Sequence, residues 1–190
     1  MSHKILIMGA PGAGTTTLGK SLAERLGCPH FDTDDVYWFT EDALPYRRKR
    51  NPDHRRQLLA ERLASTDAWV LSGSLCGWGD VFIPQFDRVV WRWLPAALRL
   101  PRIEQRERQR YGDARLDPGG DLHGVFEKFK QWAADCDEEG SGLRSRQSEL
   151  EWLERLTCPV LKLEGDIGVE ELVERVVKVV GFKPGPNGVF

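Results

Sequence analysis

Short apolar runs alternate along this chain with longer stretches in which apolar residues recur every three or four positions. The apolar runs have the length of buried strands, and they lie at residues 4–8, 29–31, 68–71, 88–93 and 159–163. The longer stretches predict helices, at residues 16–26, 52–65, 95–110, 123–137, 144–157 and 169–180. Short strands that alternate with helices of this length indicate βαβ units. We therefore expect an α/β fold with a five-stranded parallel sheet.

Segments rich in glycine, proline or charge separate these elements. Residues 111–122 contain three glycines and one proline and predict a mobile loop. Residues 181–190 contain three glycines and two prolines and predict a flexible C-terminal tail. Residues 40–52 are polar and basic, which is typical of a loop. Because no repeat is visible, we expect one domain over residues 1–180.

Composition and charge exclude several classes of protein. The chain has 190 residues, of which 41% are hydrophobic and 29% charged, a profile typical of a folded globular protein. No apolar window approaches the length of a membrane-spanning helix, and the apolar stretch near the N-terminus is too short for a signal peptide, so we expect a cytoplasmic protein without a membrane partner. The net charge of -2 does not favour nucleic acid as a partner. The four cysteines are far apart and signal neither a zinc site nor a disulfide scaffold.

A glycine-rich segment follows the first predicted strand and matches the phosphate-binding pattern G-x-x-x-x-G-K-[ST] at every fixed position except the lysine. The expected nucleotide-binding residues are Gly9, Ala10, Pro11, Gly12, Ala13, Gly14, Thr15, Thr16 and Thr17. Glycines let successive backbone N–H groups curl around a phosphate, and the next helix adds its positive end. Thr16 stands where a hydroxyl binds Mg²⁺, whereas Thr15 stands where the pattern has its lysine.

An acidic cluster, Asp32-Thr33-Asp34-Asp35, follows the second predicted strand. In a parallel strand, residues 32 and 34 point to the same side, so both carboxylates can face one pocket at the carboxyl edge of the sheet. Phosphoryl transfer needs metal charge on the phosphates and a carboxylate that positions the nucleophile. The alternative is a solvated acidic turn or a helix cap.

The segment from Gly9 to Gly14 resembles the start of the phosphate loop in adenylate kinases. The order of elements over residues 4–180 resembles the small P-loop kinases, which include nucleoside monophosphate kinases, shikimate kinase and gluconate kinase. This resemblance implies the three-layer P-loop NTPase fold, with an acceptor-binding helical insertion at residues 35–67 and a lid at residues 111–122. It also implies transfer of the γ-phosphoryl group of ATP, with Mg²⁺, to a small-molecule acceptor.

The resemblance extends to single residues. Asp32 and Asp34 are similar to the D-x-D segment of shikimate and gluconate kinases, which implies that Asp32 helps to hold Mg²⁺ and that Asp34 orients the acceptor hydroxyl and can act as a base. Adenylate kinases lack this pair, so a hydroxyl acceptor is favoured. Ser72 stands where many nucleotide kinases have aspartate, and it is a weaker metal ligand. Residues 163–166 resemble the loop whose backbone contacts adenine.

Arginines are the expected source of the charge that Thr15 lacks. Arg99, Arg102 and Arg106 lie on one face of the predicted helix and have no carboxylate three or four positions away. Arg102 and Arg106 also precede the glycine-rich loop, where the resembled kinases carry lid arginines. Arg144, beyond that loop, has no acidic neighbour at helical spacing either. We expect Arg102, Arg106 and Arg144 to neutralise the transferring phosphoryl group.

Three other functions stay open from the sequence. Thr15 and Ser72 both favour a nucleotide-binding protein with little turnover. The match from Gly9 to Gly14 favours a nucleoside monophosphate kinase. A polynucleotide 5′-end kinase would require the basic residues at 47–56 to bind strands, and its affinity would then fall steeply with salt.

Overall fold

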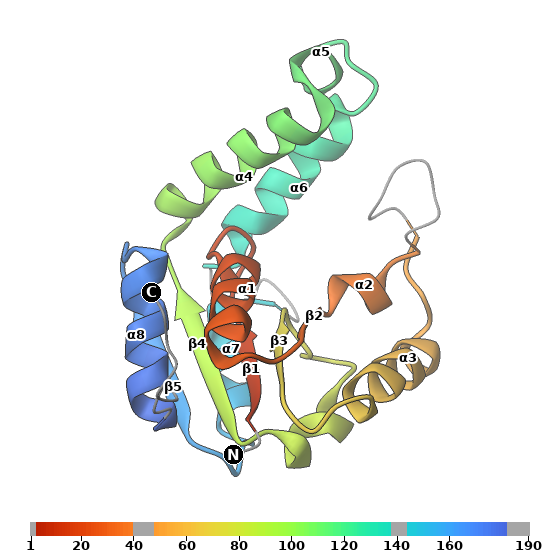
Figure 1. Cartoon of the computed structure of the whole chain (residues 1–190). Coiled ribbons are helices and arrows are strands. Elements are labelled where there is room, and N and C mark those ends of the chain that lie inside the picture. The colour runs from red at the N-terminus through yellow and green to blue at the C-terminus, as the bar shows by residue number, and fades with distance from the viewer. Residues whose placement is uncertain (1–2, 40–47, 138–143, 182–190) are drawn as a thin grey trace.

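Five parallel strands form the centre of the computed structural model, which describes residues 3–39, 48–137 and 144–181 (Figure 1). The strands are β1 (Lys4–Met8), β2 (His30–Asp32), β3 (Trp69–Ser72), β4 (Arg88–Trp93) and β5 (Val160–Glu164). Their order in the sheet is β2-β3-β1-β4-β5. From β1, at the middle of the sheet, the chain runs to β2 and β3 on one side and then crosses to β4 and β5 on the other. The strand order therefore reverses at β1, and α/β sheets bind ligands at such a switch point.

Helices cover both faces of the sheet and give it three layers (Figure 1). They are α1 (Thr15–Leu26), α2 (Asp34–Tyr37), α3 (Pro52–Ala64), the 3₁₀ helix η1 (Asp80–Gln85), α4 (Ala96–Tyr111), α5 (Asp113–Leu116), α6 (His123–Asp135), α7 (Arg146–Leu153) and α8 (Val169–Val180). Because side chains alternate along a strand, Ile5 and Ile7 pack with α1 and α8, whereas Leu6 and Met8 pack on the other face with α3, η1 and α7.

A helical arm rises beyond the carboxyl edge of the sheet. It consists of α4 and α6, which pack against each other, with α5 at the tip (Figure 1). The arm has its own small apolar core, formed by Ile103, Leu116, Leu122, Phe126 and Ala133. None of the helices in the described ranges combines the length and hydropathy that crossing a membrane requires.

The predicted five-stranded parallel sheet and the predicted long helices are confirmed, and their ends differ from the prediction by at most four residues. The short elements α2, η1 and α5 were not predicted. In particular, residues 111–122 do not form an irregular loop throughout, because α5 lies within them and its Leu116 is buried together with Leu122. The mobility of this segment stays a prediction. Most of the predicted C-terminal tail and residues 40–47 lie outside the described ranges.

Candidate active site

The predicted phosphate loop joins β1 to α1 at the switch point of the sheet. Gly12 and Gly14 have φ angles of 82° and 87°, in the left-handed region that favours glycine. Gly9 lies against β4, so closely that a Cβ there would be 2.1 Å from the carbonyl oxygen of Arg92. No side chain caps the N-terminus of α1. The first turn of α1 therefore presents its positive end and backbone N–H groups toward the loop, as phosphate binding requires.

Thr16 and Asp32 meet at the start of α1. The Thr16 hydroxyl donates a hydrogen bond to Oδ2 of Asp32 at 2.8 Å, and Oδ1 of Asp32 accepts one from the backbone N–H of Asp34 at 3.0 Å. Mg²⁺ in kinases is held by one or two protein ligands, and phosphate and water oxygens supply the others. The hydroxyl and carboxylate that the sequence predicted for the metal are adjacent, and their chemistry fits Mg²⁺.

Asp34 reaches this region differently from the prediction. It is the first residue of α2 and does not continue β2, so the strand argument for its orientation is wrong. Its Oδ1 accepts a hydrogen bond from the indole N–H of Trp38 at 3.3 Å. Solvent reaches Asp34, yet surrounding protein desolvates its carboxyl and raises the pKa, and the negative charge of Asp32 raises the pKa further. The positive charges of Arg144 and Arg106 lower the pKa of Asp34 and therefore lie within electrostatic range of it.

Ser72 anchors the phosphate loop and is not free to act as the weak metal ligand that the sequence suggested. Its buried hydroxyl lies 3.1 Å from the carbonyl oxygen of Thr15 and 2.9 Å from Nε2 of His30. The Thr15 carbonyl can only accept, so the Ser72 proton is directed there. Nε2 of His30 must then carry a hydrogen and donate it to Ser72. This series of hydrogen bonds links the first residue of α1 to β2 and β3.

Gly19 packs directly against the hydrogen-bonded side chains of Ser72 and His30. We predict that alanine at this position destabilises the protein. A Cβ at Gly19 would lie 2.1 Å from the Ser72 oxygen and 2.7 Å from Nε2 of His30. Relieving that overlap should cost about 1–3 kcal/mol in the free energy of unfolding, as overpacking does. Denaturant unfolding measures the change. Gly124→Ala in α6 is the matched control, because no atom lies within 4 Å of its Cβ position. An equal effect of both substitutions would contradict the predicted overlap.

Three arginines of α4 have carboxylate partners that sequence spacing did not reveal. Arg99 is fully buried and pairs with Asp137 at 2.5 Å. Its guanidinium also donates hydrogen bonds to three backbone carbonyls, those of Leu94, Pro11 and Ala133.

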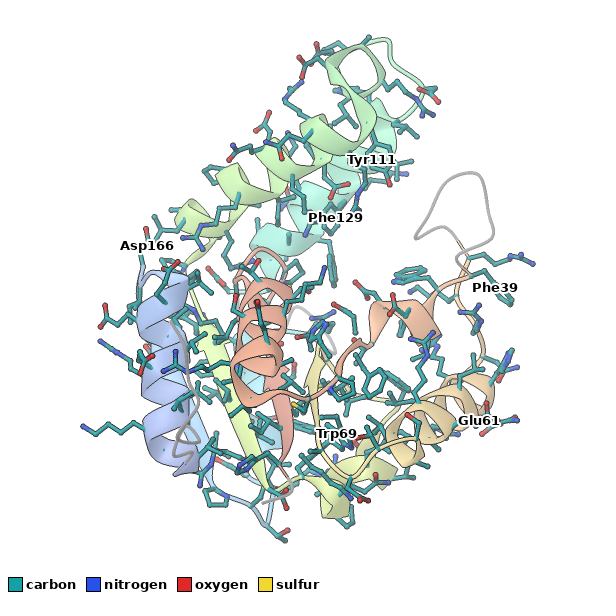
Figure 2. All side chains as sticks on the ribbon, in the orientation of Figure 1. Phe39, Glu61, Trp69, Tyr111, Phe129 and Asp166 are labelled. Carbon is teal, nitrogen blue, oxygen red and sulfur yellow. The ribbon has the colours of Figure 1, made fainter. Side chains whose placement is uncertain are left out.

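Arg102 pairs with Asp166, which lies in the loop after β5 at the foot of α4 (Figure 2). Arg106 pairs with Glu107, its neighbour in the sequence. Carboxylates at helical spacing are absent from this face of α4, as the sequence shows, but the fold supplies anionic partners from other positions.

Arg144, just before α7, lies at the phosphate loop. Its Nη2 donates a hydrogen bond to the carbonyl oxygen of Gly9 at 3.3 Å, and its guanidinium carbon lies 5.6 Å from the ring centroid of Trp132. Its Nε is buried and has no hydrogen-bond partner. Within the described ranges, no carboxylate forms an ion pair with Arg144. The structure thus brings Arg144 to the predicted nucleotide site without an ion pair in the described ranges. Its charge acts on the buried carboxyl of Glu149, where it opposes the rise in pKa that burial causes.

Two arginines of the basic segment 47–56 are buried, which limits the surface it offers to a polyanion. Arg50 donates hydrogen bonds to the carbonyl oxygens of Asp35 and Trp38. The guanidinium of Arg55 lies 3.6 Å from the ring centroid of Tyr37. Arg50 joins the segment before α3 to α2, and Arg55 of α3 packs on Tyr37 of α2. Residue 47 lies outside the described ranges, and these contacts do not favour a polynucleotide kinase.

The sheet order and the loop between β1 and α1 are those of the P-loop kinase fold. The structure resembles a shikimate kinase from Acinetobacter baumannii solved in complex with shikimate, with a TM-score of 0.57 over 95% of this chain and 93% of that chain. At 19% sequence identity, this likeness concerns the fold.

Two relatives identify the family more closely. YqaC of Bacillus subtilis is 43% identical over 177 residues, which cover 93% of this chain and 97% of YqaC. A cytidylate kinase of Archaeoglobus fulgidus is 31% identical over 139 residues, which cover 68% of this chain and 74% of that enzyme. The chain therefore belongs to the small-molecule and nucleotide kinases of the P-loop fold, as a relative of YqaC and, more distantly, of the archaeal cytidylate kinases. No family model matches it.

Proposed function

We propose that the protein transfers the γ-phosphoryl group of ATP, bound with Mg²⁺, to a hydroxyl group of a small-molecule acceptor. The observation that carries this proposal is the contact between Thr16 and Asp32 at the start of α1, next to Asp34. One place in the structure combines the groups that the reaction needs. It holds a hydroxyl and a carboxylate suited to the metal, a helix N-terminus suited to phosphates and a second carboxylate suited to the acceptor. These are the parts that phosphoryl transfer requires.

The residues from Gly9 to Thr17 would hold the triphosphate. Backbone N–H groups at the start of α1 bind phosphate oxygens, and Thr16 and Asp32 would hold Mg²⁺ through the hydroxyl and the carboxylate. Held there, Mg²⁺ would supply positive charge that offsets part of the charge of the phosphates. Ser72 supports this site indirectly, because its hydrogen bond fixes the carbonyl group of Thr15.

Asp34 would orient the acceptor hydroxyl and accept its proton. The carboxyl is held by Trp38, and its raised pKa makes it a better proton acceptor than an ordinary exposed carboxylate. Arg106 and Arg144 lie within electrostatic range of Asp34, so they would face the group in transit between ATP and the acceptor.

Arg102 has a different proposed role from the triphosphate contact that the sequence suggested. Its ion pair with Asp166 holds the guanidinium at the loop after β5. That loop resembles the adenine-contacting loop of related kinases. The ion pair therefore supports a position for Arg102 beside the nucleoside part of ATP and away from the transferring phosphoryl group.

One observation favours a second acceptor class. The cytidylate kinase of Archaeoglobus fulgidus aligns over most of its length, and its name assigns it a nucleotide acceptor. Nucleoside monophosphates therefore belong among the acceptors to be tested. The carboxylate pair Asp32 and Asp34 still favours a hydroxyl acceptor. Threonine at position 15 keeps a third outcome open, in which the protein binds nucleotide with little turnover.

A single assay tests the proposal. ADP release from ATP and Mg²⁺ is measured against nucleoside monophosphates, nucleosides, sugar acids and shikimate-like polyols, and ATP binding is titrated on the same sample. We expect turnover with one acceptor class and its loss when EDTA removes Mg²⁺, because the phosphate charge is then uncompensated. ATP binding without turnover on the panel, followed by activity in Thr15→Lys, would identify a nucleotide-binding protein. Absence of ATP binding would overturn both functions.

A further inference from the structure

The phosphate loop of this chain lacks a cation of its own. Thr15 is uncharged, and the first turn of α1 contains no lysine or arginine. Lys20 is exposed farther along α1, and its charge acts on His30. Arg25 forms an ion pair with Glu174 on α8. In the pattern that this loop otherwise matches, a lysine reaches the β- and γ-phosphates. If the loop binds a triphosphate, the missing charge must come from another element.

Contacts within the protein already occupy most arginines near the loop. Arg99 is buried against Asp137 and three carbonyl oxygens, and Arg102 and Arg106 have their own carboxylate partners. Arg108 forms ion pairs with three carboxylates, those of Glu104, Asp113 and Asp117. Each of these groups would have to give up an ion pair before it could bind phosphate.

Arg144 differs from them in two respects. Its Nη2 touches the first residue of the phosphate loop, Gly9, through a 3.3 Å hydrogen bond. Its Nε is buried and has no hydrogen-bond partner, so the guanidinium retains an unused donor. Arg144 therefore contacts the phosphate loop directly and keeps a guanidinium donor that no group in the described ranges occupies.

We propose that Arg144 replaces the missing lysine, so that its guanidinium, reaching in from the start of α7, binds the terminal phosphates of the nucleoside triphosphate. This inference rests on the proposed function and assigns one of its components. Guanidinium is well suited to the role because it is always charged and offers several donors in a planar fork. The cation would thus come from a residue far along the chain rather than from the loop itself.

A cycle of four proteins tests the replacement: the wild type, Arg144→Gln, Thr15→Lys and the double variant. The readouts are the dissociation constants for ATP and ADP and the rate of ADP formation. Removing one preorganised donor should lower the rate about 10²–10³-fold in Arg144→Gln and should reduce the preference for ATP over ADP. Lysine at position 15 should recover about tenfold or more of that loss in the double variant, because it returns the same charge from the opposite side. In the wild type, lysine should add little, because Arg144 already supplies that charge.

Two further variants separate this role from a structural one. Arg144→Lys should retain part of the ATP preference because the charge remains. Arg25→Gln removes an arginine that pairs with Glu174 on α8, and it should leave nucleotide binding unchanged. If Thr15→Lys changes the rate and the ATP preference by the same factor with and without Arg144, the two cations act independently and the inference is wrong. Wild-type binding of ATP with an unaltered ATP preference in Arg144→Gln would also overturn it while leaving the proposed function intact. If the wild type binds no ATP, the proposed function fails and the inference fails with it.

Discussion

Asp34→Asn is expected to lower the turnover number by a factor of about 10²–10⁴, the range that general acid–base catalysis contributes. Asparagine preserves the size of the side chain and the oxygen that accepts the hydrogen bond from Trp38. It removes the negative charge that would attract the proton of the acceptor hydroxyl. ATP affinity should change little, because the contacts proposed for the triphosphate come from the phosphate loop, Thr16, Asp32 and Arg144. Steady-state kinetics with the acceptor identified in the panel, together with an ATP titration, measure both quantities.

Asp35→Asn is the matched control for this substitution. Asp35 is the next residue of α2, but its carboxylate pairs with Arg62 of α3 at 3.1 Å on the surface. A surface pair of this kind contributes about 0–1 kcal/mol, so the turnover number should stay close to that of the wild type. Equal losses in the two variants would show that disturbance of α2, and not the Asp34 carboxylate, explains the result.

The pH dependence of kcat/KM provides a second measurement on Asp34. The carboxylate is the form that accepts a proton, so activity should fall as the pH drops through the pKa of this group. Burial and the charge of Asp32 raise that pKa, so the fall should begin at a higher pH than for an ordinary exposed carboxyl. The residual activity of Asp34→Asn should lack this acidic limb. An unchanged acidic limb in the variant would assign the titration to another group.

Arg99→Met is expected to destabilise the protein by about 3–5 kcal/mol, which is the usual cost of removing one partner of a buried ion pair. The substitution leaves Asp137 without its cation and three carbonyl groups without their donor. Methionine fills part of the volume, so the loss reflects mainly the polar contacts. Denaturant unfolding at constant m-value measures the change.

Arg25→Met is a suitable control for the loss of an arginine, because its ion pair with Glu174 lies on the surface. Its effect should stay within about 1 kcal/mol. Arg99→Lys tests the geometry, since an ammonium group can keep the contact with Asp137 but cannot donate along the several directions of a guanidinium. A loss below about 1 kcal/mol for Arg99→Met would show that the buried network contributes little net stability.

The sequence predicted the sheet and the long helices because both depend on periodic burial. Apolar side chains that alternate or recur every three to four residues define the faces that pack, as for Leu18 and Leu22 of α1, both buried. The phosphate loop was predictable for a related reason, since its glycine spacing reflects local backbone conformation. The proximity of Thr16 and Asp32 was also predictable, because Thr16 lies at the start of α1 and Asp32 at the end of β2. The two side chains form a hydrogen bond.

The partners of the arginines were not predictable, because they depend on the tertiary fold. Arg102 and Asp166 are 64 residues apart, and Arg99 and Asp137 are 38 residues apart. Helical spacing detects only neighbours on the same turn of a helix, so it could not detect either pair. Ser72 was misjudged for a similar reason. The sequence shows a hydroxyl at the end of a strand, but only the fold shows that this hydroxyl is buried beneath α1.

The position of Arg99 also restricts how the arm can move. Its guanidinium donates hydrogen bonds to the backbone carbonyl oxygens of Pro11 in the phosphate loop, Leu94 just after β4 and Ala133 in α6. A rotation of the whole arm relative to the sheet would also move the phosphate loop, because one guanidinium holds all three carbonyl groups by hydrogen bonds. We therefore expect independent bending only in the outer part of the arm, toward α5, and joint movement of the inner part and the phosphate loop.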